Sequence, residues 1–217
     1  RFLDYMLVSS SHWMDVDVCH FSDDPLTYGG QWEHAREHCL GSHMACSHEW
    51  VAGLLDYYHF TGDEKALEVA VGIGENVMRI LNSPQFQDYG ALHARESGWA
   101  LRTFIDIHSE TNDEKWLEKC DWIVGHFEEW EKKYGKWLAP YTDNTLIRVV
   151  FMIAIAINSL MRYYRVRPSE KIKGMIIRGI EDLLENCVMD SGLFCYKELP
   201  SLQKPSNANI LEALTNA

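Results

Sequence analysis

The chain repeats one short segment at a fifty-residue interval, and this repeat constrains its fold more than any other feature. Residues 61–68 (TGDEKALE) return at 111–118 as TNDEKWLE, and a weaker copy, PSEK, follows at 168–171. His43 falls opposite His93 at the same offset, so the repeated unit includes the helix before this segment as well as the helix after it. A period of this length is typical of stacked helical hairpins.

The spacing of apolar residues predicts six helices and the start of a seventh. The helix before each repeated segment is rich in apolar residues and the helix after it is amphipathic, so inner and outer helices alternate. We therefore expect an all-α fold, an incomplete (α/α) toroid of repeated helical hairpins over residues 31–217. The expected helices span about residues 44–61, 63–82, 91–109, 113–133, 144–165 and 169–186, and the last begins at 209.

The ends of the chain differ from this pattern. Within residues 1–30, the first nine are largely apolar, and residues 12–20 alternate imperfectly before a Ser-Asp-Asp-Pro turn. This pattern predicts a short irregular or β entry segment, or the end of a preceding domain. The chain begins without a methionine and stops inside an expected helix, so we expect a fragment of a longer protein.

In the first hairpin, Trp50, Leu54 and Tyr57 are spaced to bury one face of a helix.

The composition excludes several classes of protein. A formal net charge of −12 argues against a nucleic-acid partner, because phosphate binding requires a basic face. The longest apolar run, residues 149–160, is too short to cross a bilayer. None of the six cysteines forms a CxxC pair, which argues against a zinc knuckle and favours free buried thiols over disulfides.

Histidines are concentrated in the segment before the first hairpin, where four fall within fifteen residues. His34 and His38 would share a helix face and could hold a metal with Glu33 or Glu37, although the order of residues is not HExxH. We favour sugar-binding histidines over a metal site, and leave a divalent cation, calcium or zinc, as the alternative. Trp32, next to this cluster, is a candidate stacking aromatic.

The loops that lead into the apolar helices carry the other candidate site residues, as the rim of a carbohydrate-binding cleft would. The repeat places His43 and His93 at equivalent helix entrances, and Arg95 and Glu96 follow within one turn. Several of these residues have a structural alternative: a helix cap for Glu96, Asp143 or Asn144, and a buried ion-pair partner for Glu49. The remaining candidates are His48, Trp137 and Tyr141.

Four segments carry a resemblance to a known family. Residues 32–34, 42–44, 47–50 and the run LDYYHFTGD at 55–63 resemble bacterial (α/α)-toroid polysaccharide-degrading proteins, in particular exo-rhamnogalacturonan-lyase-like proteins. This resemblance implies a polysaccharide lyase that cleaves an acidic, uronate-containing glycan by β-elimination. It implies His43 or His93 as the base, Tyr141 as the acid, and Arg95 with Asn144 around the uronate carboxylate.

Two other functions stay open at this point. A glycoside hydrolase would use a pair of carboxylates, for which Glu49, Glu96 and Asp143 are available. A non-catalytic helical-repeat scaffold would instead use its rim to bind a protein or a glycan. The expected partner is an acidic oligosaccharide or polysaccharide, the expected location is periplasmic or secreted rather than cytoplasmic, and the residues do not give the oligomeric state.

Overall fold

The structure is a computed structural model that describes residues 1–32, 44–87, 93–140, 146–198 and 208–216. Its contacts divide the chain into two compact units. Unit 1 contains Arg1–Gln87 and Thr103–Leu117, and unit 2 contains Asp88–Arg102 and Glu118–Ala217.

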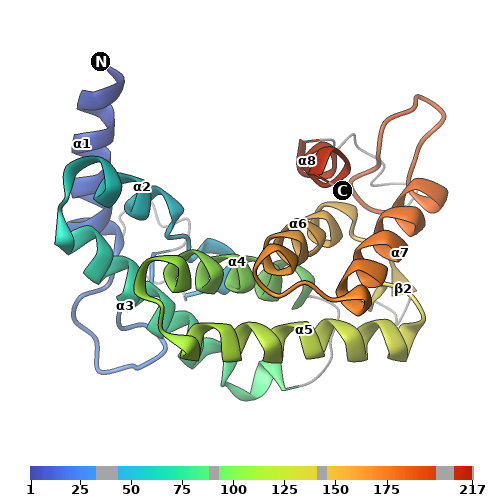
Figure 1. Cartoon of the computed structure of the whole chain (residues 1–217), viewed down its shortest axis with the longest axis horizontal. Coiled ribbons are helices and arrows are strands. Elements are labelled where there is room, and N and C mark those ends of the chain that lie inside the picture. The colour runs from blue at the N-terminus through green and yellow to red at the C-terminus, as the bar shows by residue number, and fades with distance from the viewer. Residues whose placement is uncertain (33–43, 88–92, 141–145, 199–207, 217) are drawn as a thin grey trace. The chain divides into compact units, whose positions relative to one another are not determined.

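The described chain is built almost entirely of helices, which confirms the all-α class (Figure 1). Helices occur in pairs joined by short turns, as the repeat predicts. A single two-stranded antiparallel ribbon, β1–β2, is described, with Ala139 opposite Ile147. The bounds of the α-helices are α1 Phe2–His12, α2 Ala52–Thr61, α3 Glu64–Leu81, α4 His93–Thr111, α5 Glu114–Tyr134, α6 Val150–Val166, α7 Glu170–Asn186 and α8 Ala208–Asn216; β1 is Ala139–Pro140 and β2 is Leu146–Ile147.

The repeated segment makes the same turn in both of its full copies. After α2, Gly62 has a φ of 73° and the side chain of Asp63 accepts a hydrogen bond from the backbone N–H of Lys65. After α4, Asn112 has a φ of 52° and Asp113 accepts from the N–H of Lys115. A left-handed residue that ends one helix and an aspartate that caps the next explain why this box recurs.

Unit 1 buries the apolar faces of its helices against one another. Helix α2 packs on α3, with Leu54 and Ile73 completely covered. Gly74 lies so close to Ile107 and Trp116 that a methyl group in its place would clash with the Ile107 side chain. Protein interiors are packed this densely only where side-chain sizes match, so Gly74 is part of the core.

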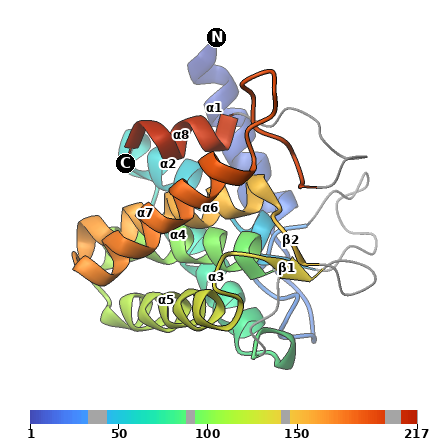
Figure 2. The same cartoon turned by 90° about the vertical axis from the view of Figure 1, so that its right-hand side faces the viewer.

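Unit 2 is organised around α6, its most apolar helix. It packs against α7 on one side and α8 on the other (Figure 1), and its buried residues include Ile157 and Leu160. Figure 2 shows the β1–β2 ribbon leading into the beginning of α6. A methyl group at Gly98 of α4 would lie only 3.1 Å from the Ala156 backbone, so these helices approach closely.

The entry segment is more regular than the sequence suggested. Helix α1 continues into a π-helix, Trp13–Asp17, and the strand-like part is confined to an antiparallel bridge between Val18 and Gln31. Trp50 corrects another expectation, because it precedes α2 and is 44% exposed rather than buried. Its backbone N–H bonds to the Gln31 side chain, so the helix begins only at Ala52.

Two expectations about chemistry concern the described residues. The five cysteines within the described ranges are buried and free, as expected. No helix in those ranges combines the length and the apolar character needed to cross a membrane.

Candidate functional site

Unit 1 contains a cleft whose walls carry three tryptophans. Its volume is about 490 Å³, within the range of small-molecule sites. Polar side chains of four kinds, a hydroxyl, a carboxylate, an amide and an imidazole, line the cleft together with the indole rings. The lining residues are Ser9, Trp13, Asp17, Gln31, Trp32, His48 and Trp50.

One wall of the cleft comes from the entry segment. The π-helix Trp13–Asp17 supplies two lining residues, and π-turns of this kind are frequent at functional sites. The backbone N–H of Trp32 donates to the carbonyl of Asp17 at 2.9 Å, next to the Val18–Gln31 bridge. These backbone contacts hold Trp32 beside Asp17 although fourteen residues separate them in the chain.

A buried hydrogen-bond network holds the second wall. Glu49 is 0% exposed, and both of its carboxylate oxygens lie 3.0 Å from the backbone nitrogen of Gln31, which donates to them. Gln31 Oε1 accepts from the N–H of Trp50 at 2.7 Å, and Thr103 donates to the Glu49 carbonyl. The two segments that line the cleft are thus tied to each other.

The aromatic rings of the cleft are fixed by their neighbours. Trp13 lies against Gly53, where a methyl group would be 2.9 Å from the ring. The His48 and Trp50 rings are 5.8 Å apart, and His48 Nδ1 is 3.1 Å from the hydroxyl of Ser47. Flat indole faces next to hydrogen-bonding groups suit a neutral ligand that has both C–H faces and hydroxyls.

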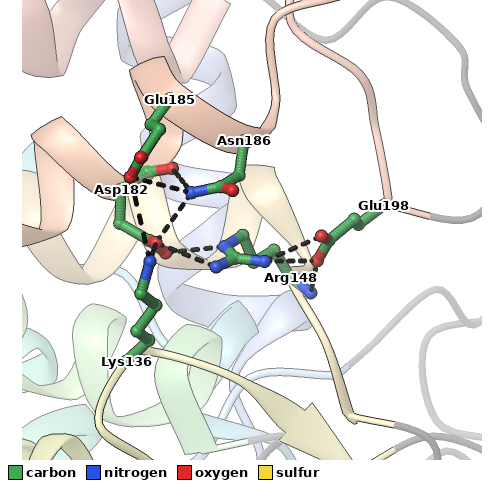
Figure 3. Close-up of polar contacts among 6 residues, drawn as sticks. All are labelled: Lys136, Arg148, Asp182, Glu185, Asn186 and Glu198. Atoms are coloured by element: carbon green, nitrogen blue, oxygen red, sulfur yellow. Dashed lines mark hydrogen bonds and ion pairs between the residues drawn. The ribbon is translucent and has the colours of Figure 1, made fainter.

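A second polar cluster, in unit 2, is centred on Arg148 (Figure 3). Arg148 is 8% exposed and makes a two-pronged ion pair with Asp182, at 2.6 and 2.9 Å. Its Nη1 donates to both carboxylate oxygens of Glu198, and Lys136 also pairs with Asp182. Because these charges are matched within the protein, we interpret the cluster as structural.

The carboxyl group of Asp182 shows the effect of this cluster. Burial alone would raise its pKa, but the hydrogen bonds and charges of Arg148 and Lys136 outweigh burial and hold the pKa below the ordinary value of 3.8. The same contacts raise the pKa of Arg148. Both groups therefore stay charged, and neither is poised to exchange a proton near neutral pH.

The structure brings together some of the site residues named from the sequence. Trp32 and His48 line the same cleft, but Glu49 beside them is covered and accepts from the backbone N–H of Gln31. Its burial agrees with its structural alternative, and the ion pair in that alternative stays a prediction. In unit 2, Arg95 and Glu96 form an ion pair of 3.1 Å in the first turn of α4. Their roles toward a substrate stay predictions.

Other named residues have a packing role or lie outside the described ranges. Trp137 is 2% exposed and its ring stacks on Phe127 and Trp130. His93 is the first residue of α4. The remaining candidates, His34, His43, Tyr141, Asp143 and Asn144, lie outside the described residues.

Sequence reasoning missed five lining residues: Ser9, Trp13, Asp17, Gln31 and Trp50. Trp13 and Asp17 belong to the entry segment, which the repeat does not cover. Trp50 has the spacing of a buried helical residue, and Gln31 is unremarkable without its partners. The density of tryptophans around the histidine cluster was the signal available in the sequence.

The described ranges contain no group of three or more His, Cys, Asp or Glu side chains that could hold a metal ion. His34 and His38, with Glu33 and Glu37, lie outside those ranges, so the metal alternative at that cluster stays untested.

Comparison with known families gives one match. A family model described as beta-L-arabinofuranosidase, GH127 catalytic domain, matches residues 23–167, more than half of the chain. This segment includes Gln31, Trp32, His48 and Trp50 of the cleft. No curated protein and no solved structure shows a comparable similarity.

This match corrects the function expected from the sequence. The matched domain is that of a glycosidase, so the expectation of a polysaccharide lyase acting by β-elimination is wrong, and the likeness to exo-rhamnogalacturonan-lyase-like proteins is not supported. The coarser expectations hold: an (α/α) fold, an enzyme, and a carbohydrate substrate. The roles of base and acid for His43, His93 and Tyr141 were implied for β-elimination, so they no longer apply once the lyase is rejected. Any other role of these residues toward a substrate stays a prediction.

Proposed function

The chain belongs to the β-L-arabinofuranosidase GH127 catalytic-domain family, and from this premise we propose that the protein is a glycoside hydrolase releasing L-arabinofuranose from β-linked arabinosides. The family match carries this proposal. The cleft of unit 1 supports it, since most of its lining residues lie in the matched segment.

The cleft offers what a glycosidase needs to hold a sugar. Trp13, Trp32 and Trp50 provide apolar faces for the C–H face of a sugar ring, and burying such a face is favourable. Asp17, Gln31 and His48 provide hydrogen-bonding groups at the edge of those faces. A neutral pentose has both kinds of surface, so it fits this lining better than a carboxylated sugar does.

Hydrolysis also requires groups that exchange protons with the leaving oxygen and with water. Asp17 and His48 are the titratable side chains among the described lining residues, and both are half-buried. Asp17 Oδ1 lies 3.6 Å from His12 Nε2, and a protonated His12 would stabilise the negative charge of the Asp17 carboxylate. We propose Asp17 and His48 as the first groups to examine for proton transfer.

The proposal is tested by measuring released arabinose from a chromogenic β-L-arabinofuranoside, with the α-anomer and a β-arabinopyranoside as comparisons. The β-furanoside should be hydrolysed fastest. Trp32→Ala and Trp50→Ala should each raise KM roughly ten-fold, because an aromatic contact of this kind is worth more than about 1 kcal/mol.

Trp122→Ala is the matched control, because Trp122 lies on α5 and does not line the cleft. It should leave KM unchanged. Absence of turnover on all arabinosides would reject the proposed activity. If Trp32→Ala and Trp50→Ala leave KM unchanged, as Trp122→Ala should, then the cleft is not the binding site for the sugar.

A further inference from the structure

Gln31 stands out among the residues of the cleft because it is a polar side chain that is only 6% exposed. Buried amides in proteins normally satisfy both of their polar atoms, since an unmade hydrogen bond is costly. A buried amide at the wall of a cleft therefore raises the question of what each of its two ends binds.

The oxygen end of the amide is identified by its partner. The atom 2.7 Å from the backbone nitrogen of Trp50 must accept a hydrogen bond, because a backbone N–H can only donate. This contact therefore identifies which end of the amide is oxygen, because the assignment follows from the hydrogen-bond partner. The amide nitrogen must point in another direction.

The nitrogen end has no acceptor within the described part of the chain. Gln31 Nε2 makes no hydrogen bond to that part of the chain. It is not one of the fully buried polar atoms without a partner either. Because Gln31 lines the cleft, this uncovered donor is available to a ligand bound there.

The orientation of Gln31 is held from two sides. Its backbone N–H is fixed by the carboxylate of Glu49, at 3.0 Å to both oxygens, and its side-chain oxygen is fixed by Trp50. A donor whose direction is set before binding loses little conformational entropy when a ligand arrives.

We infer that Gln31 is a specificity-determining residue whose amide donates a hydrogen bond to a hydroxyl or ring oxygen of the bound sugar. This inference rests on the proposed function, because it places a neutral sugar in the tryptophan cleft. A site that holds such a donor rejects analogues that lack the matching oxygen, since the donor then stays unpaired.

Two variants separate the donor role from the structural role of Gln31. Gln31→Glu keeps an oxygen for the Trp50 N–H but has no N–H donor when ionised, whereas Gln31→Met lacks both groups. If the donor matters, both variants raise KM for the arabinofuranoside roughly ten-fold. If Gln31 only supports Trp50, Gln31→Glu keeps the wild-type KM and the inference is overturned.

Deoxy analogues of the same arabinoside, lacking the 2-, 3- or 5-hydroxyl, identify the acceptor. One analogue should lose affinity for the wild-type protein and show no further loss with Gln31→Glu, as expected when the two changes remove one contact. For all three analogues, the loss of affinity from the missing hydroxyl can instead multiply with the loss from the variant. In that case the acceptor is the ring oxygen if Gln31→Glu binds the parent arabinoside more weakly than the wild type does. If Gln31→Glu binds it as well as the wild type does, the inference is overturned.

The outcome is distinguishable from a failure of the proposed function. Each protein is also titrated with L-arabinose while its tryptophan fluorescence is followed, so binding is measured whether or not turnover occurs. Binding by the wild-type protein that Gln31→Glu weakens supports the inference even without hydrolysis. Equal binding by both proteins, with equal thermal stability, rejects it while leaving a hydrolase activity intact.

Discussion

At the scale of single residues, the position of Trp13 depends on the absence of a side chain at Gly53. The ring of Trp13 lies only 2.9 Å from the position that the first side-chain carbon of any other residue would take at Gly53. Gly53 is on α2, and Trp13 is on the π-helix of the entry segment. A helix usually gains from replacing glycine with alanine, so the retention of a glycine here reflects packing against the cleft wall.

Gly53→Ala should therefore displace Trp13 and weaken binding of L-arabinose several-fold, because a tilted indole no longer presents its face to the cleft. The helix itself should remain intact, which circular dichroism measures. Gly125→Ala is the matched control, since nothing lies within 4 Å of that position on α5. It should raise stability by about 0.8 kcal/mol and leave binding unchanged; unchanged binding in Gly53→Ala would contradict this reading of Trp13.

At the scale of elements, each full copy of the repeated segment, 61–68 and 111–118, ends one helix and starts the next. Thr61 donates to the carbonyl of Tyr57, and Thr111 donates to the carbonyl of Ile107, so the last turn of each preceding helix is closed in the same way. The lysines of the two boxes pair with acidic residues of neighbouring elements, Lys65 with Asp15 and Lys115 with Glu75. These exposed pairs contribute little to stability, whereas the caps contribute more.

Removing a cap should lower stability without changing the fold. Asp63→Ala and Asp113→Ala should each reduce the free energy of unfolding by about 1 kcal/mol, since each leaves a helix N–H without its acceptor. Asp56→Ala, an exposed change in the middle of α2, should have little effect or a small favourable one. Urea denaturation measures all three, and a loss confined to one cap would contradict the equivalence of the two boxes.

The helices could be predicted from the sequence because they depend on local signals. The expected helix at about 63–82 is observed at 64–81, and the one expected at 169–186 is observed at 170–186, with Ser169 as its cap. The first helix was predicted to begin too early, since the contact between Trp50 and Gln31 that delays it joins residues far apart in the chain. Local patterns cannot reveal such a contact.

The candidate site could be predicted only in part for the same reason. Trp32 and His48 were named because aromatic residues and histidines cluster near them in the sequence. Asp17 reaches the cleft through a π-helix and a backbone bond to Trp32, and neither leaves a trace in the pattern of residues. Glu49 looked like a substrate ligand, but only the structure shows that its carboxylate is covered.

At the scale of the whole molecule, the buried charge of Asp182 should appear in the response to acid. Its pKa is lowered in the folded state, so its contribution to stability is complete above the ordinary value of 3.8 and is lost as the pH falls through the lowered value. Above pH 3.8, Asp182→Asn should reduce the free energy of unfolding by roughly 3 kcal/mol, because Arg148 loses a charged partner.

The difference between Asp182→Asn and the wild type should shrink as the pH falls below 3.8, where the unfolded chain takes up the proton first, and should be smallest below the lowered pKa, where the folded carboxyl is neutral as well. Glu181→Gln, an exposed change on the same helix, serves as the control and should follow the wild type at every pH. Chemical denaturation across this range measures the effect. A constant difference at all pH values would show that Asp182 acts through its shape rather than its charge.

The order of residues around Arg148 has a consequence for synthesis of the protein. Both carboxylates that neutralise this arginine come later in the chain, Asp182 by 34 residues and Glu198 by 50. A growing chain therefore carries Arg148 and the apolar helix α6 out of the ribosome before either partner has emerged. Since chains emerge from the N-terminus onward, Arg148 can pair first with Asp182 of α7 and only later with Glu198. A ribosome stalled between these two residues would leave Arg148, just before α6, with one of its two carboxylate partners.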